Sequence, residues 1–289
     1  MIRLVFLGTS AAIPSPDRNL SSIAIQKDGS VYLFDCGEGT QRQMMRYGVS
    51  YEKVVAIFIT HLHLDHFLGI FGLLETRKLK GRTEKIKIFG PPGTKNLFEK
   101  EEYVEVFDIL RGGKVYSDKG FCVFAFRSNH GLKYSFGYIF QESEKIRFIA
   151  EKAHAMGLKG PMFSQILQKG KLKVGNRTIL LSEISYKAKG KCIVYTGDTK
   201  PLHRVPQLAK NADIIIHDAT YSVERSREAR ERNHSTSADA ARFAKKAKSK
   251  LLILTHISGR YPNPTILEDE AKRIFKNSRA AYDGMEILL

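Results

Sequence analysis

Seven short runs of apolar residues recur along this chain, and they constrain its fold more than any other feature. They are rich in β-branched and aromatic side chains and lie at residues 31–35, 54–60, 121–127, 192–196, 214–217, 251–255 and 285–289. Runs of this length favour β-strands, and several are apolar almost throughout, which is typical of strands covered on both faces. A further short run that ends at Gly8 predicts a first strand near the N-terminus.

Two segments between these runs have the character of helices. Residues 237–248 are rich in Ala and Lys, and His234-Ser235-Thr236-Ser237 before them offers several N-cap residues. Residues 264–276 follow Asn263, a good N-cap, and begin with a proline, which suits the first helical position. Strands in the majority with helices between them predict an α/β fold in which helices pack outside β-sheets.

The composition limits the class of protein. A length of 289 residues, 43% of them hydrophobic, suits one large α/β domain or two small ones and excludes disorder and disulfide-stapled folds. The three cysteines, Cys36, Cys122 and Cys192, lie in or beside apolar runs, so we expect buried thiols in a reducing compartment. No run reaches the roughly 18 apolar residues of a membrane span or the roughly 7–15 of a secretion signal. We therefore expect a soluble, cytoplasmic protein with no membrane partner.

The chain also carries a large excess of positive charge. Lys and Arg number 47 against 30 Asp and Glu, a net charge of +17. This excess favours a polyanionic partner, either nucleic acid or an anionic membrane surface, unless the whole proteome of the organism is basic.

Residues 155–191 concentrate Gly, Pro and Lys and lose the regular spacing of apolar residues. They are interpreted as a basic excursion from the core, either a mobile segment or an ordinary surface loop or hairpin.

The strongest chemical signal is the hexapeptide His61-Leu62-His63-Leu64-Asp65-His66, which follows the apolar run 54–60. His61 and His63 are two residues apart on an extended segment, so both imidazoles point the same way and can share a metal. Asp65 and His66 lie where the chain turns into a helix, and they suit a second metal nearby. Nitrogen and oxygen donors favour Zn²⁺ first, with Mn²⁺ or Fe as substitutes.

Three further donors stand at the ends of apolar runs. His130 follows the run 121–127, Asp198 follows 192–196, and His256 follows 251–255. Four strand ends would then deliver polar side chains to one edge of the core. The sequence therefore predicts a two-metal site.

These residues carry a resemblance. His61-x-His63-x-Asp65-His66, then His130, Asp198 and His256, match in order the motif series of the metallo-β-lactamase superfamily. Within it the chain resembles the ribonuclease Z family of tRNA 3′-processing endonucleases over essentially its whole length. The more specific segments are Asp-Cys-Gly-Glu-Gly-Thr-Gln at 35–41, His-Ser-Thr at 234–236, and those at 6–10, 195–199 and 256–261. The resemblance implies a four-layer αββα sandwich, a single domain over residues 1–289 with an inserted flexible, protruding basic arm at 155–185.

The resemblance also implies a set of metal ligands. One Zn²⁺ would bind His61, His63 and His130, and a second would bind Asp65, His66 and His256, with Asp198 bridging the two, so that each chain holds two ions. Paired ions of this kind share a water molecule and lower its pKa toward neutrality. By hypothesis, Asp65 also takes the proton of that water as it attacks phosphorus.

A proton for the leaving 3′-oxygen would come from His234, oriented by Asp218. Side chains alternate along a strand, so if Asp218 faces the site its neighbour His217 faces away. The family usually has Glu at the position of Asp218, so the carboxylate here has a shorter reach.

Other expectations concern substrate binding. The family has a Pro-x-Lys-x-Arg-Asn loop associated with sensing the RNA 3′ end, and residues 14–19 here lack the Lys, so discrimination against a mature CCA end can differ. The arm is the family's tRNA exosite, and relatives form homodimers in which one subunit's arm serves the other's site. The candidate substrate-binding residues are Arg18, Asn19, Gly160, Pro161 and Arg260.

The sequence thus predicts a zinc-dependent endoribonuclease that removes the 3′ trailer from precursor tRNA and leaves a 3′-hydroxyl group on the tRNA. One alternative is a phosphodiesterase of the same superfamily that acts on small or cyclic nucleotide phosphodiesters. The other is a non-catalytic RNA-binding module, which has no need of seven metal donors.

Overall fold

The structure of this chain is a computed structural model that describes residues 1–204 and 206–289. The chain divides into two compact units. The first comprises Met1–Asp118, Cys122–Gln141 and Cys192–Leu289, and the second comprises Lys119–Phe121 and Glu142–Lys191. No helix in the described part of the chain is long and apolar enough to cross a membrane. The three cysteines are free, and Cys36 and Cys192 are buried.

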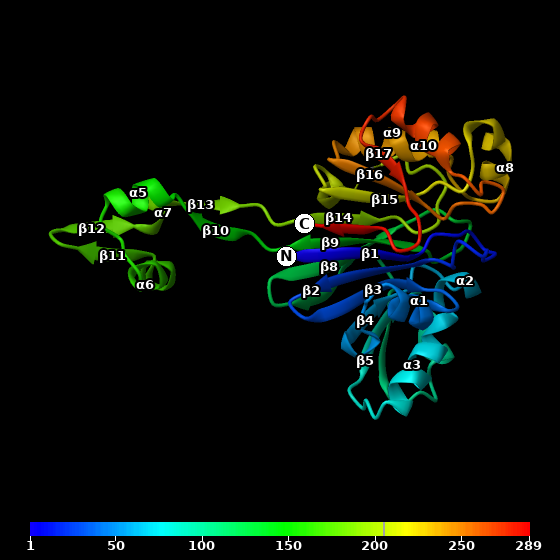
Figure 1. The fold of residues 1–289 in the computed structure, drawn as a ribbon, viewed down its shortest axis with the longest axis horizontal. Coiled ribbons are helices and arrows are strands. Elements are labelled where there is room, and N and C mark those ends of the chain that lie inside the picture. Colours follow the sequence, from blue (N-terminus) through cyan, green and yellow to red (C-terminus); the bar gives the residue numbers. More distant parts are fainter. Residues whose placement is uncertain (205) are drawn as a thin grey trace. The chain divides into compact units, whose positions relative to one another are not determined.

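The first unit is built on two seven-stranded sheets (Figure 1). One sheet has the order β18-β1-β2-β3-β4-β5-β6. Its strands are β1 (Ile2–Gly8), β2 (Ser22–Lys27), β3 (Ser30–Cys36), β4 (Val54–Phe58), β5 (Ile86–Gly90), β6 (Val104–Asp108) and β18 (Glu286–Leu288). β1 to β3 pair antiparallel, whereas β3 to β6 pair parallel.

The other sheet has the order β17-β16-β15-β14-β9-β8-β7. Its strands are β7 (Gly113–Asp118), β8 (Phe121–Arg127), β9 (Phe136–Glu142), β14 (Cys192–Tyr195), β15 (Ile214–Asp218), β16 (Leu251–Thr255) and β17 (Ser278–Ala280). β14, β15, β16 and β17 are parallel, so their carboxyl ends lie at the same edge. The connections between them carry the helices on the outer face.

Helices cover the outer face of each sheet, as Figure 1 shows. On the first sheet these are α1 (Thr40–Arg46), α2 (Leu64–Phe67), α3 (Gly69–Leu79) and α4 (Thr94–Leu97), with the short helix η1 (Tyr51–Lys53). On the second they are α9 (Ser237–Ala247) and α10 (Thr265–Lys272), and the connections of this sheet also contain η2 (Gln207–Ala209), η3 (Val223–Arg225) and α8 (Ser226–Glu231). Two separate hydrophobic clusters fill the helix–sheet layers.

The inner faces of the sheets meet through aromatic side chains. Phe34 and Phe58 of the first sheet stack with ring centroids 4.9 Å apart, and both contact Tyr138 of the second. All three are almost fully buried. The layers therefore run helix, sheet, sheet, helix, which confirms the predicted αββα sandwich.

The helix predictions are met with small shifts at the ends. Thr236 is the N-cap that α9 uses, since its hydroxyl group accepts a hydrogen bond from the Asp239 amide at 3.3 Å. α10 ends at Lys272 rather than at residue 276. Ile274 and Phe275 instead pack against the core beneath the second sheet, which ends the helix early.

The second unit has regular structure that its composition does not predict. It contains the strand pairs β10 (Lys145–Phe148) with β13 (Ser185–Ala188) and β11 (Lys171–Val174) with β12 (Arg177–Leu180). Its helices are α5 (Ala150–Ala155), α6 (Met162–Lys169) and α7 (Leu181–Ile184). Five buried apolar side chains form its core: Ala153, Leu158, Ile166, Ile179 and Ile184. The unit begins before the 155–191 segment that composition marked, because β13 pairs with β10, which lies at residues 145–148.

Candidate metal centre

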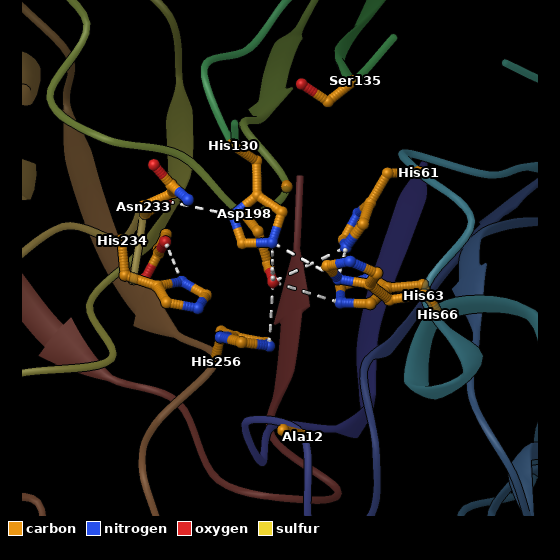
Figure 2. Close-up of polar contacts among 12 residues, drawn as sticks. Ala12, His61, His63, His66, His130, Ser135, Asp198, Asn233, His234 and His256 are labelled. Carbon is orange, nitrogen blue, oxygen red and sulfur yellow. Dashed lines mark hydrogen bonds and ion pairs between the residues drawn. The ribbon is translucent and has the colours of Figure 1, made fainter. Parts of the chain in front are cut away.

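The predicted metal donors converge at one end of the two sheets (Figure 2). His61 lies just beyond the end of β4, and His130 just beyond the end of β8. Asp198 and His256 follow β14 and β16, whose carboxyl ends lie at the same edge because the strands are parallel. Residues that are far apart in the sequence therefore share one site.

The hexapeptide presents its donors in two directions. His63 has extended backbone angles (φ −82°, ψ 144°) and is the N-cap of α2. His61 Nε2 lies 2.8 Å from His63 Nδ1, and their rings meet edge to face. Asp65 and His66 lie in the turn of α2 that follows, on the side of His256. The change from extended chain to helix thus separates one ligand group from the other.

Asp198 lies between the two groups. Its Oδ2 atom is 3.1 Å from His256 Nε2 and 3.3 Å from His66 Nε2. The same atom is 3.8 Å from His130 Nε2 and 3.9 Å from His61 Nε2. Figure 2 shows this carboxylate in the middle of the imidazole rings. This position is the one that a bridging ligand would need.

The residues present fit a pair of dications. The donor atoms of His61, His63 and His130 lie within 4.8 Å of one another, as do those of Asp65, His66 and His256. In the described part of the chain, His66 Nε2, His256 Nε2 and Asp198 Oδ1 are buried without any hydrogen-bond partner. Buried polar atoms are rarely left unpaired, so two such imidazole nitrogens beside the Asp198 carboxylate indicate a cation site. Imidazole and carboxylate donors without sulfur suit Zn²⁺ or Mn²⁺.

Hydrogen bonds from the far side of the rings orient two of the ligands. His130 Nδ1 lies 3.0 Å from the Asn233 carbonyl oxygen, and His256 Nδ1 lies 2.9 Å from the Thr220 hydroxyl group. If Nδ1 carries the proton in each case, the Nε2 lone pair faces the centre, as metal-ligating histidines require. The sequence predicts no role for Thr220. The one feature that could have drawn attention to it is its position two residues after Asp218.

Asp35 supports His66 in the same way. Its Oδ2 atom accepts hydrogen bonds from His66 Nδ1 at 2.7 Å, Tyr195 OH at 2.8 Å and Thr60 Oγ1 at 2.9 Å. Its Oδ1 atom accepts a fourth from the Thr60 amide at 2.8 Å. Asp35 is fully buried with φ +57° at the end of β3. The sequence marks Asp35 only as part of the motif at 35–41, and the feature that could have identified its role is that an acidic residue ends an apolar strand.

The electrostatics of the centre favour a positive charge. Burial alone would raise the pKa values of Asp65 and Asp198, but the imidazoles of His66 and His256 outweigh it and hold both well below their usual range. Burial would also lower the pKa of His66, but the carboxylates of Asp198 and Asp35 raise it well above normal. The carboxylates therefore favour a positive charge at His66, whereas burial lowers the pKa values of His61, His63 and His130; a bound dication would supply positive charge without a proton.

A histidine–carboxylate pair stands beside the metal donors. Asp218, at the end of β15, accepts a hydrogen bond from His234 Nδ1 at 2.9 Å through its Oδ2 atom. The Thr199 amide bonds the same oxygen, and the amide and hydroxyl groups of Thr220 bond Oδ1. Burial lowers the pKa of His234, but the charge and hydrogen bond of Asp218 prevail and raise it to about 9. The shorter aspartate thus reaches its partner.

His217 points away from this pair. It is fully buried, its Nδ1 lies 2.8 Å from the Asp218 carbonyl oxygen, and its ring lies against Phe243. The alternation of side chains along β15 accounts for the different environments of these neighbours.

A cavity of about 810 Å³ opens over the metal donors. Its wall includes His63, Asp65, His130, Asp198, His234, His256, Tyr221, Arg232, Arg260 and the loop 11–15. The Ala12 amide in that loop donates a hydrogen bond to Asp65 Oδ2 at 3.2 Å. The cavity therefore exposes the donors to a ligand the size of a nucleotide or larger.

Two of the predicted substrate-binding residues also make bonds that hold the fold. The Arg18 guanidinium donates to Thr9 Oγ1 at 2.6 Å and to the Ala281 carbonyl oxygen at 2.8 Å, and it is 8% exposed. The backbone N–H group of Asn19 donates to Asp283 Oδ2 at 2.6 Å, and its side-chain amide donates to the Glu38 carbonyl oxygen at 2.8 Å. These bonds tie the 14–19 loop to the C-terminal segment and to Glu38.

The other three predicted residues lie in different places. Arg260 lines the cavity, pairs with Glu228 at 3.0 Å, and lies over the ring of Tyr221. Gly160 and Pro161 belong to the second unit, where they precede α6. Gly160 has φ +45° and is exposed, which a glycine tolerates at such a turn.

Comparisons with known proteins agree with this geometry. A family model described as "Anti-Pycsar protein Apyc1" matches residues 2–278. A ribonuclease Z of Methanothermobacter thermautotrophicus is 41% identical over 297 residues, which is 99% of this chain and 96% of the relative. A ribonuclease Z of Archaeoglobus fulgidus is 41% identical over 299 residues, covering 99% and 97%.

Solved structures share the fold. The short form of human tRNase Z superimposes with a TM-score of 0.70 at 29% identity and covers 99% of this chain and 98% of its own. The metallo-β-lactamase fold protein YhfI of Bacillus subtilis gives a TM-score of 0.73 at 18% identity, with the same coverage.

Proposed function

Because this chain belongs to the ribonuclease Z family, and also to the family described as anti-Pycsar protein Apyc1, we propose that it removes the 3′ trailer from precursor tRNA by endonucleolytic cleavage. It is a metal-dependent enzyme that hydrolyses phosphodiesters. The observation that carries the proposal is the convergence of seven metal donors at the foot of an open cavity, in a chain matched to ribonuclease Z over 99% of its length.

The proposed ligands are those that the sequence predicts. One Zn²⁺ would bind His61, His63 and His130, and the other Asp65, His66 and His256, with Asp198 between them; Mn²⁺ is the proposed substitute. When bound, such ions polarise the phosphodiester and lower the pKa of a water molecule to near neutrality.

Asp65 is the better placed of the two carboxylates to take a proton from the attacking water. Its side chain is 13% exposed and lines the cavity, whereas that of Asp198 is 3% exposed. The Ala12 amide holds Asp65 Oδ2, which fixes the carboxylate toward the cavity.

His234 would supply the proton that the leaving group needs. Asp218 holds its Nδ1 atom, so Nε2 is the atom left to donate. A pKa of about 9 keeps the imidazole protonated at neutral pH. Attack of water on phosphorus breaks the bond to the 3′ oxygen, which takes the His234 proton and becomes the 3′-hydroxyl group of the tRNA. The phosphate stays on the trailer.

We propose the second unit as the surface that grips the tRNA away from the cleaved bond. Between residues 142 and 191 there are eleven Lys and Arg against four Asp and Glu, a net charge of +7. Cations of this density contact phosphates and position the RNA without reading its sequence. The arrangement expected in the cytoplasm is a homodimer in which one subunit's second unit serves the other's site.

A cleavage assay tests the proposal. Purified protein with Zn²⁺ should cut a 3′-extended tRNA transcript once, near the discriminator base, and leave a 3′-hydroxyl end. A chelator or Asp65→Ala should abolish the cut. Rapid turnover of a small or cyclic nucleotide phosphodiester without any cut in tRNA would favour the alternative phosphodiesterase, and RNA binding without turnover would favour a non-catalytic module.

A further inference from the structure

A second basic hollow lies away from the metal donors. A cavity of about 600 Å³ opens between α10 and the segment 276–285, and we call it the α10 groove. Its wall includes Lys272, Lys276, Arg279 and Tyr282. These four side chains are exposed, so the groove presents cations and an aromatic ring to solvent.

The positive charge of the groove is only partly neutralised from within. Its one acidic side chain, Glu268, already pairs with Lys272 and accepts a hydrogen bond from the Ala280 amide at 2.7 Å. Within the described residues, Lys276 and Arg279 form no ion pair. Cations that outnumber the acidic side chains of a hollow raise the local concentration of an anionic ligand.

Secondary structure fixes the direction of the arginine. Ser278 and Ala280 of the edge strand β17 are buried, and Arg279 between them is exposed. Because side chains alternate along a strand, Arg279 must face outward. Tyr282 follows three residues later with 59% of its side chain exposed, an unusual degree for an aromatic residue in a charged hollow.

The 14–19 loop links the α10 groove to the metal-site cavity through shared lining residues. Pro14 and Ser15 line both that cavity and a smaller one of about 290 Å³ on the other side of the 14–19 loop. Arg18 lines both the smaller cavity and the α10 groove. A strand that leaves the metal centre over this loop would therefore arrive at Lys276 and Arg279.

We propose that the α10 groove binds a single-stranded segment of the RNA substrate that flanks the cleaved bond. Lys276 and Arg279 contact its phosphates, and Tyr282 stacks on one base. Positive grooves that carry an aromatic platform bind single strands in this way without reading sequence. The inference rests on the proposed function, and the segment can belong either to the trailer or to the tRNA end.

The first test measures binding without turnover. A fluorescent ten-nucleotide single-stranded RNA is titrated with the Asp65→Ala protein and with the same protein carrying Lys276→Glu and Arg279→Glu. Each phosphate contact on a single strand contributes about 0.7 to the slope of log affinity against log salt concentration, so loss of two contacts should lower the magnitude of this slope by about 1.4. The ratio of the parent's affinity to that of the charge-reversed variant should therefore shrink about sevenfold between 50 and 200 mM salt. The control variant carries Lys87→Glu and Lys114→Glu, which make the same charge change on exposed strand residues outside the groove. Its slope should be closer to that of the parent protein.

The aromatic residue gives an independent readout. Tyr282→Ala should weaken binding of the same oligonucleotide about 5- to 150-fold, whereas Tyr282→Phe should restore most of it, because stacking needs the ring and not the hydroxyl group. Equal affinities for the parent, the charge-reversed variant and Tyr282→Ala would overturn the proposal, whether or not the protein cleaves tRNA.

Cleavage with trailers of one and ten nucleotides identifies the bound segment. If the groove holds the trailer, Lys276→Glu with Arg279→Glu should raise KM only for the long trailer. If it holds the tRNA end, KM should rise for both. An unchanged KM for both substrates would overturn the proposal, and hydrolysis of a small phosphodiester should be unaffected throughout.

Discussion

Replacement of Thr220 by valine removes one hydroxyl group that serves two parts of the centre. That hydroxyl accepts a hydrogen bond from His256 Nδ1 at 2.9 Å and donates one to Asp218 Oδ1 at 2.7 Å. Valine has nearly the same shape, so packing is kept while both bonds are lost. The Nδ1–H group of His256 is then buried without a partner, which costs about 1–3 kcal/mol. Removing such a partner of a metal ligand typically weakens metal binding about 10–100-fold, a range that agrees with this cost.

A zinc titration against a competing chromophoric chelator measures the effect. One of the two Zn²⁺ affinities should fall about 10–100-fold in Thr220→Val, and Thr220→Ser should restore it because the hydroxyl group returns. Thr94→Val is a matched control, since Thr94 is fully buried and its hydroxyl group donates a hydrogen bond to the Pro91 carbonyl oxygen, which is not part of the metal centre. It should lower the melting temperature without changing either affinity. An unchanged zinc affinity in Thr220→Val would refute the role assigned to Thr220.

Three other predictions follow from the same structure. His234→Ala should lower kcat for trailer removal about 10²–10⁴-fold. The wild-type rate should fall as the pH rises through about 9, because the proton donor is the protonated imidazole of His234 and Asp218 raises the pKa of that imidazole to about 9. The residual rate of His234→Ala should not show this fall at alkaline pH. Asp35→Asn should lower the free energy of unfolding by about 1–3 kcal/mol for each donor left unpaired, measured by denaturant titration of the metal-free protein. An Asn-Gly turn can replace residues 143–190, because the Glu142 amide donates to the Lys191 carbonyl oxygen at 2.8 Å and the two ends are therefore close. This variant should keep its hydrolysis of a small phosphodiester but lose most of its tRNA cleavage. Equal loss on both substrates would contradict the proposed role of the second unit.

The sequence was most informative where local pattern and chemistry coincide. β8 and β16 have the predicted bounds, because apolar runs bounded by polar residues mark strands well. The donors at 130, 198 and 256 could be found for a related reason, since a polar residue that ends a buried strand has few structural uses.

The parts that could not be predicted depend on contacts between distant segments. Asp35 and Thr220 bind no metal in this account, and their importance appears only when His66 and His256 are seen beside them. Arg18 has the same limitation, because its burial depends on the Ala281 carbonyl oxygen 263 residues away.

The sequence predicts an inserted basic segment but not the strands and helices of the second unit, for another reason. Its core contains only five buried apolar side chains, and its strands are four residues long, so no periodicity stands out from the surrounding Lys and Gly residues. Strand pairing, rather than composition, defines where the unit begins and ends.

The most direct test of the account is the metal content of the purified protein, measured by elemental analysis together with X-ray absorption at the metal edge. We expect two equivalents of transition metal per chain, bound through nitrogen and oxygen alone, and a clear loss of metal in Asp198→Ala. A chain that retains no metal after supplementation with Zn²⁺, or an ion held by sulfur, would contradict the two-metal centre.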